Sequence, residues 1–106
     1  MKPVTYRHNW DSKMSREEEM AEKFGQLLVS HDTSEDYEEE TSSLFVRDGE
    51  YTWIDSNGCS CWDGDYDGWI LDLEELKALA KKTYDNRYDG RDRAEELVAG
   101  WVLENL

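Results

Sequence analysis

Hydrophobic residues recur every three or four positions in three parts of the chain, which is the spacing of one face of an α-helix. The first part covers residues 16–30, and Ser15 begins it as the cap of a capping box. The second part covers residues 72–82. The third begins at Asp92, after a loop over residues 85–91. The sequence therefore predicts three helices.

The middle of the chain has the pattern of a β-hairpin. Two runs rich in aromatic and β-branched residues, 44–47 and 50–54, flank the dipeptide Asp48-Gly49. Both positions of a tight hairpin turn need a positive φ angle, which Asp and Gly adopt more readily than most residues. The sequence therefore predicts two antiparallel strands joined by a two-residue turn.

This turn would pair Arg47 with Glu50, which is a favourable cross-strand charge pair. Residues 4–6 are a candidate third strand, and residues 55–58 have the composition of a further turn. The alternation of side chains along the hairpin places four residues on one face, which we expect to be the sheet side of the core: Leu44, Val46, Tyr51 and Trp53.

Residues 31–43 contain almost nothing apolar and many acids, which predicts a solvated acidic loop. The order of elements is then helix, hairpin, loop, helix, helix. That order is typical of an α+β fold, in which a small antiparallel β-hairpin or sheet packs against about three helices. At 106 residues the chain has the length of one domain, residues 1–106.

Charge narrows the classes of partner. Asp and Glu number 26 and Lys and Arg number 12, so the formal net charge is −14. Such a surface repels nucleic acid and anionic membranes, and it attracts basic protein surfaces and divalent cations. We therefore expect no direct nucleic-acid binding and no membrane binding. Residues 1–8 lack the apolar core of a signal peptide, so the expected compartment is the cytoplasm.

Aromatic residues argue for a folded chain, because disordered chains are poor in them. The chain has five Trp, six Tyr and two Phe. We expect four of the tryptophans to lie in the core: Trp53, Trp62, Trp69 and Trp101. Alternatively, Trp62, Tyr66 and Trp69 surround an acidic segment, where exposed rings would form a hot spot for a basic partner.

That acidic segment is Asp63–Glu74, and acids stand at its first, third, fifth and last positions. It resembles the calcium loop of the EF-hand family, in which these positions hold the ion, the sixth is Gly and the seventh lends a backbone carbonyl. The resemblance implies bound Ca²⁺, or Mg²⁺, with five ligands: Asp63, Asp65, Asp67, Trp69 through its carbonyl, and Glu74.

The chain departs from that family in two respects. Residues 56–62 do not form an entering helix, and Leu71 at the ninth position has no side-chain oxygen. The alternative is a solvated turn rich in Asp and Gly.

Two cysteines, Cys59 and Cys61, could supply thiolates to a metal. Structural zinc needs four ligands, and only His8 and His31 remain as further candidates. Zinc is therefore not expected, and we predict free thiols. No motif places a histidine beside either cysteine, so we expect no enzymatic activity.

The segment Gly58-Cys59-Ser60-Cys61-Trp62 resembles a motif in short uncharacterised proteins of actinobacterial phages. The resemblance implies a phage accessory protein, a class rich in inhibitors of host machinery. Such a protein would act in the host cytoplasm.

The acid run at residues 35–40 could imitate a phosphate backbone, as DNA mimics do. The alternative is an acidic solubilising loop. Our first hypothesis is a non-enzymatic binding protein whose acidic and aromatic surface engages the basic surface of a host protein and inhibits or modulates that protein. Our second is a small calcium-binding module. The expected partner contacts are Glu35, Asp36, Glu38, Glu39, Trp62 and Tyr66.

Overall fold

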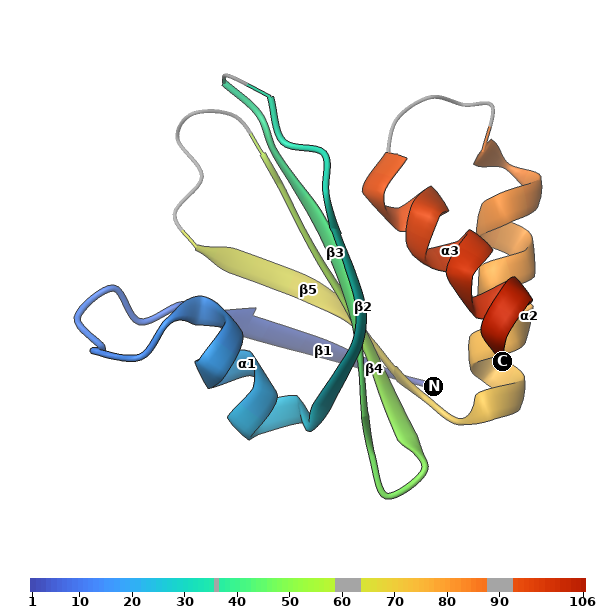
Figure 1. Cartoon of the computed structure of the whole chain (residues 1–106), viewed down its shortest axis with the longest axis horizontal. Coiled ribbons are helices and arrows are strands. Elements are labelled where there is room, and N and C mark those ends of the chain that lie inside the picture. The colour runs from blue at the N-terminus through green and yellow to red at the C-terminus, as the bar shows by residue number, and fades with distance from the viewer. Residues whose placement is uncertain (36, 59–63, 88–92) are drawn as a thin grey trace.

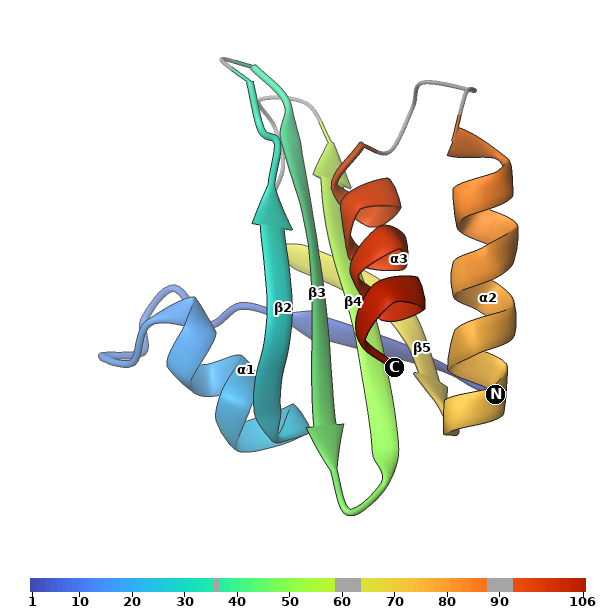
Figure 2. The same ribbon diagram turned by 45° about the vertical axis from the view of Figure 1, so that its right-hand side comes forward.

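The computed structural model describes residues 1–35, 37–58, 64–87 and 93–106. Eight elements follow one another: β1 (Lys2–Arg7), α1 (Arg16–Phe24), β2 (Gln26–Asp32), β3 (Glu39–Arg47), β4 (Glu50–Gly58), β5 (Asp65–Leu71), α2 (Leu73–Asp85) and α3 (Arg93–Asn105). The strands form one antiparallel sheet in the order β1-β5-β4-β3-β2. Helix α1 covers one face of this sheet, and α2 and α3 cover the other (Figures 1 and 2). The predicted α+β class is confirmed.

The predicted hairpin is the centre of the sheet. Arg47 faces Glu50 in the register of β3 and β4. Asp48 and Gly49 have φ angles of 52° and 79°, the left-handed values that a two-residue hairpin turn requires. The predicted strand at residues 4–6 lies within β1, which pairs with β5.

The sheet has a core on each face because successive strand residues point to opposite sides. Leu44 and Trp53 pack against α2 and α3, as predicted, and Tyr51 borders them. Their neighbours Phe45 and Ile54 pack on the opposite side with α1. The α1 side also contains Tyr6, Met20, Phe24 and Tyr66. The face that we predicted for the core is thus one of two.

The first predicted helix is too long. Helix α1 ends at Phe24, and Gly25 follows with a φ angle of 104°, where a residue with a Cβ atom is strained. The Arg47 side chain donates hydrogen bonds to the last carbonyl groups of α1. Residues 26–32 leave the helix and pair with β3 as β2. Their helical spacing is overridden by the partner strand.

The predicted loop at residues 31–43 is wrong at both ends, because β2 continues to Asp32 and β3 begins at Glu39. The predicted turn at residues 55–58 is wrong, because β4 continues to Gly58. The polar residues there satisfy one another across the strands. The Trp53 indole donates to Ser42 Oγ at 2.8 Å, and the hydroxyl groups of Thr41 and Ser56 are hydrogen-bonded. Hydrogen bonds between polar side chains therefore accompany the pairing of β3 and β4 where the sequence lacks the apolar pattern of a strand.

The second and third predicted helices are confirmed. Asp72 caps α2 through a complete capping box with Glu75, and the helix continues to Asp85. Helix α3 begins at Arg93. Its predicted cap, Asp92, and most of the predicted loop at 85–91 lie outside the described residues. No helix in the described part of the chain is long and apolar enough to cross a membrane.

Candidate functional site

The acid run lies at the end of the sheet where β2 and β3 meet (Figure 1). We call residues 32–35 and 37–40 the acidic arm. Its main chain is tied across: the Thr33 amide donates to the Glu40 carbonyl at 3.0 Å. Glu35 and Glu38 exchange two backbone hydrogen bonds of 3.0 Å each. The described part of the segment predicted as a solvated loop is therefore a hydrogen-bonded hairpin end.

Ser34 ties the base of the acidic arm. Its amide donates to Asp32 Oδ1 at 2.9 Å, and its Oγ accepts from the Glu40 amide at 2.9 Å. The hydrogen bonds from Ser34 hold the pKa of Asp32 below its usual value, because they stabilise the ionised carboxylate. The ionised form of Asp32 is therefore favoured at the base of the arm.

Three side chains at the end of the acidic arm point into solvent. Tyr37 is 76% exposed, and Glu35 and Glu38 are exposed on either side of it. Together with Ser34 they line a shallow depression of about 630 Å³. Asp36, a predicted contact residue, lies outside the described residues. The arm thus presents an aromatic ring flanked by carboxylates.

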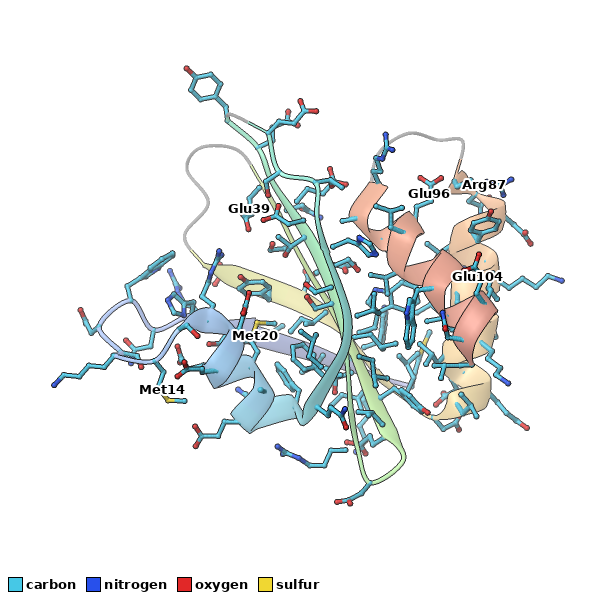
Figure 3. The ribbon with its side chains drawn as sticks, in the orientation of Figure 1. Met14, Met20, Glu39, Arg87, Glu96 and Glu104 are labelled. Atoms are coloured by element: carbon cyan, nitrogen blue, oxygen red, sulfur yellow. The ribbon has the colours of Figure 1, made fainter. Side chains whose placement is uncertain are left out.

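The last two acids of the run turn back into the fold. Glu39 lies on the α1 side of the sheet (Figure 3), where its Oε1 accepts from Ser56 Oγ at 3.1 Å. The same oxygen is 3.6 Å from Arg16 Nη1. Glu40 lies on the other side and accepts from the Ala94 amide at 3.0 Å. Glu39 and Glu40 are therefore both bonded within the fold. Glu39, a predicted partner contact, is thus engaged by Ser56 and Arg16.

Tyr66 is also enclosed. Its side chain belongs to the α1-side core at 6% exposure, and its hydroxyl accepts from Arg16 Nη1 at 2.9 Å. Burial raises the pKa of Tyr66, against the opposing effect of Arg16. Tyr66, a predicted partner contact, is therefore buried in this structure. Trp62, its predicted companion, lies outside the described residues.

The predicted calcium ligands are spread along one strand. Asp65, Asp67 and Trp69 lie on β5, which has β1 on one side and β4 on the other. Glu74 lies beyond the strand, in the first turn of α2. A strand rises about 3.3 Å per residue, so Asp65 is roughly 20 Å from Leu71, where β5 ends. These ligands do not surround a common centre, and Asp63 lies outside the described residues.

Gly68, the expected turn glycine, serves a different purpose. Its φ angle is not in the left-handed region. A Cβ atom there would lie 1.9 Å from the Trp53 carbonyl oxygen, so glycine is required by the close approach of β4. The alternate acids that resemble a calcium loop here have the period of a strand.

The register does bring a different acid beside the predicted ones. Asp55 of β4 stands directly opposite Asp67 of β5. Asp65 lies on the same face two residues away. Sequence reasoning missed Asp55 because the strand was predicted to end at residue 54. Within the described ranges, no three acidic, histidine or cysteine side chains form a group that could hold a metal ion.

The two histidines lie apart, one beyond β1 and one on β2. His8 Nδ1 is 3.0 Å from Glu19 Oε2, without the alignment of a hydrogen bond, and both side chains are largely buried. The ring of Trp10 meets the His8 ring edge-on at 4.5 Å between centroids. No sequence motif signals this pair, since its members belong to separate elements. It links the end of β1 to α1. Cys59 and Cys61 lie outside the described residues.

Tyr6 adjoins the same pair. Burial, and then the charge of Glu19, raise the pKa of Tyr6 to about 12. The neutral phenol is thus strongly favoured in the folded chain. A histidine and carboxylate pair can serve as an acid–base pair, and here both side chains are largely buried.

Comparisons with known proteins give no family: no family model matches the sequence, no curated protein matches it, and no solved structure matches the fold. The functional argument therefore depends on the geometry of the acidic arm and of the sheet.

Proposed function

We propose that this chain is a non-enzymatic acidic binding protein that engages the basic surface of another protein through the acidic arm. The observation that carries the proposal is the exposure of Tyr37, at 76%, between two exposed glutamates on a hydrogen-bonded hairpin end. In the phage setting that the sequence resemblance implies, the partner is a host protein in the host cytoplasm. Binding there would inhibit or modulate it.

Order in the arm supports this role. A disordered acidic segment loses conformational entropy when it binds, whereas an ordered one has already lost it. The crossed hydrogen bonds of Ser34, Glu35 and Glu38 fix the arm before any partner arrives. A tyrosine on such a support offers a large contact area with few rotatable bonds.

Charge supports the choice of a basic partner. The net charge of −14 raises the rate of encounter with a positive surface and repels nucleic acid. Carboxylates at the end of a rigid hairpin could occupy a groove that normally holds phosphates, as a DNA mimic does. The chain would then compete with nucleic acid for a protein rather than bind it.

The test compares two double variants with equal loss of charge. In the first, Glu35→Gln and Glu38→Gln neutralise the arm. In the second, Glu17→Gln and Glu22→Gln neutralise exposed positions of α1. Proteins captured from host lysate are identified by mass spectrometry. The proposal expects one protein to be captured by the native chain and by the α1 variant, and lost by the arm variant.

Two results would contradict the proposal. One is capture of nothing beyond what an unrelated protein of the same net charge captures. The other is equal loss with both double variants, which would mean that the total charge matters and the arm does not.

A calcium-binding module is the second candidate. It is favoured by Asp55 standing opposite Asp67, since like charges in directly facing strand positions destabilise a sheet. A divalent cation between them would relieve that repulsion.

Calcium titration by calorimetry tests this candidate, with Asp48→Asn in the hairpin turn as the control. Asp67→Asn should abolish binding in any arrangement that uses β5. Glu74→Gln should abolish it only if the segment rearranges into an EF-hand-like loop. An unchanged melting temperature in chelator and in millimolar calcium would exclude the candidate.

A further inference from the structure

Strand β2 forms an outer edge of the sheet. In the described part of the chain its one neighbouring strand is β3, and the opposite edge is β1 (Figure 2). Helix α3 packs against β2 and β3 and covers a face of the sheet. The outward backbone groups of β2 are therefore placed to pair with a further strand.

The two edges differ in how they are protected. Folded proteins usually block an edge with lysine, proline or other charge, and β1 carries Lys2, Pro3 and Arg7. Strand β2 lacks such residues until Asp32 at its end. Residues 24–31 are the longest run in this highly charged chain without Asp, Glu, Lys or Arg. The most neutral segment of the sequence thus forms an unblocked edge.

A bulge locates the usable part of this edge. The register between β2 and β3 shifts between Leu27 and Val29, and bulges interrupt regular pairing. Residues 29–32 are regular beyond it and lead directly into the acidic arm. The free edge and the arm are therefore one continuous surface.

We propose that residues 29–32 of β2 are a docking edge for an extended segment of the partner, a strand with a mainly uncharged centre and Lys or Arg at the end that meets the acidic arm. The neutral edge suits the centre of such a strand. The acidic arm that follows the edge suits its basic end. The inference rests on the proposed function, because it assigns a shape to the same basic partner.

Charge also argues against a second copy of this chain at the edge. Each copy carries a net charge of −14, so a contact between two copies brings like charges together. Like charges at such a contact repel. A basic strand meets no such repulsion.

The probe is a synthetic peptide with five alternating valine and threonine residues between two pairs of lysines. The control peptide has the same charge but proline at its centre, which removes a ladder hydrogen bond. Amide hydrogen exchange is followed by NMR in the full chain. We expect the strand peptide to slow exchange of outward amides in residues 29–32 by about ten-fold or more, and the proline peptide to leave it unchanged.

Two lysine variants provide a matched comparison. Ser30→Lys places a charge on β2 and removes the hydrogen bond between Ser30 Oγ and Ser43 Oγ, and Thr5→Lys places a charge at an exposed position of β1. Both variants are first checked for an unchanged fold by circular dichroism and melting. Ser30→Lys should remove the protection by the strand peptide, and Thr5→Lys should retain it.

Three results would overturn the docking edge. They are equal protection by both peptides, protection that rises with protein concentration in the absence of peptide, and no protection at millimolar peptide. The host-lysate capture separates this inference from the proposed function. If the arm variant loses the partner but Ser30→Lys keeps it, the function stands and the docking edge is wrong. If the peptide protects β2 but no partner is captured, the edge is supported and the function fails.

Discussion

Gly68 of β5 lies so close to Trp53 of β4 that a Cβ atom on Gly68 would be 1.9 Å from the Trp53 carbonyl oxygen. The same added atom would be 2.8 Å from the Cα atom of Ile54. Neither contact can be relieved by a side-chain rotation, because both involve the main chain. Strands β4 and β5 can pair at this point only with glycine.

Gly68→Ala should therefore destabilise the chain by about 2–3 kcal/mol or more, since the β4–β5 ladder must separate to admit a methyl group. The matched control is Gly100→Ala in α3, where the added Cβ would meet Tyr84 at an ordinary 3.6 Å. Alanine is the better helix former, so the control should raise stability by about 0.5–1 kcal/mol. Urea unfolding measures both. A Gly68→Ala chain as stable as the native one would show that the strands do not approach as described.

Replacing Glu40 and replacing Glu38 should have different effects on the stability of the chain, although both residues are glutamates of the acidic arm. Glu40 accepts a hydrogen bond from the Ala94 amide in the first turn of α3, whereas Glu38 points into solvent. Glu40→Ala should lower the free energy of unfolding by about 1 kcal/mol, because it leaves a helix amide without its acceptor. Glu38→Ala removes the same charge and should change stability by less than about 0.5 kcal/mol. Thermal unfolding of the two variants side by side tests this contrast, and equal effects would contradict it.

Ser34→Ala should raise the pKa of Asp32 toward its ordinary value, because the Ser34 side chain is the largest cause of its lowering. Carboxyl chemical shifts followed by NMR from pH 2 to pH 6 report this pKa. The lowered pKa contributes stability above the unfolded value of 3.8, and that contribution is lost as the pH falls through the folded pKa. Ser34→Ala should therefore reduce the acid-dependent part of stability. A pKa that does not move would mean that Ser34 does not hold the arm.

Alkaline unfolding should depend on Tyr6. Its folded pKa of about 12 exceeds the ordinary value of 10.0, so the folded chain holds a proton that the unfolded chain releases. The resulting stability is fully present below pH 10 and is lost as the pH rises toward 12. Tyr6→Phe should show a smaller loss over this interval. Tyr37→Phe, at an exposed position, serves as the control and should follow the native chain. Parallel curves for native and Tyr6→Phe proteins would contradict the assignment.

The sequence predicts best where a local rule acts alone. Asp48 and Gly49 specify the hairpin turn through their backbone preferences, and Asp72 with Glu75 specifies the start of α2. The class of fold follows from these elements and from the order in which they occur. None of these features needs information about distant parts of the chain.

The errors arise where a partner strand decides the structure. Residues 26–30 have helical spacing, yet they extend because Gly25 ends the helix and β3 offers hydrogen bonds. Thr41 and Ser56 are polar and look like loop residues, yet each supplies the other's hydrogen bond. Such pairing joins residues far apart in sequence, and composition alone does not reveal it.

The candidate site shows the same division. The exposure of Glu35 and Glu38 follows from their charge, but the inward turn of Glu39 depends on Arg16 and Ser56. For the segment that resembles a calcium loop, the spacing of the acids fits two structures equally well. Acids at every second residue suit a cation loop and equally one face of a strand, and the neighbouring strands β1 and β4 favour the strand.

The sheet order also has a consequence for how the molecule is made. Strands β2 to β5 follow one another as neighbours, so each can pair with the strand before it during synthesis. Strand β1 leaves the ribosome first, yet Tyr6 pairs with Tyr66 near the other end of the meander. Long-range pairings of this kind form slowly. We expect β1 to remain unpaired during translation until β5 has been synthesised. Its pairing with β5 should then be the step that limits the folding rate.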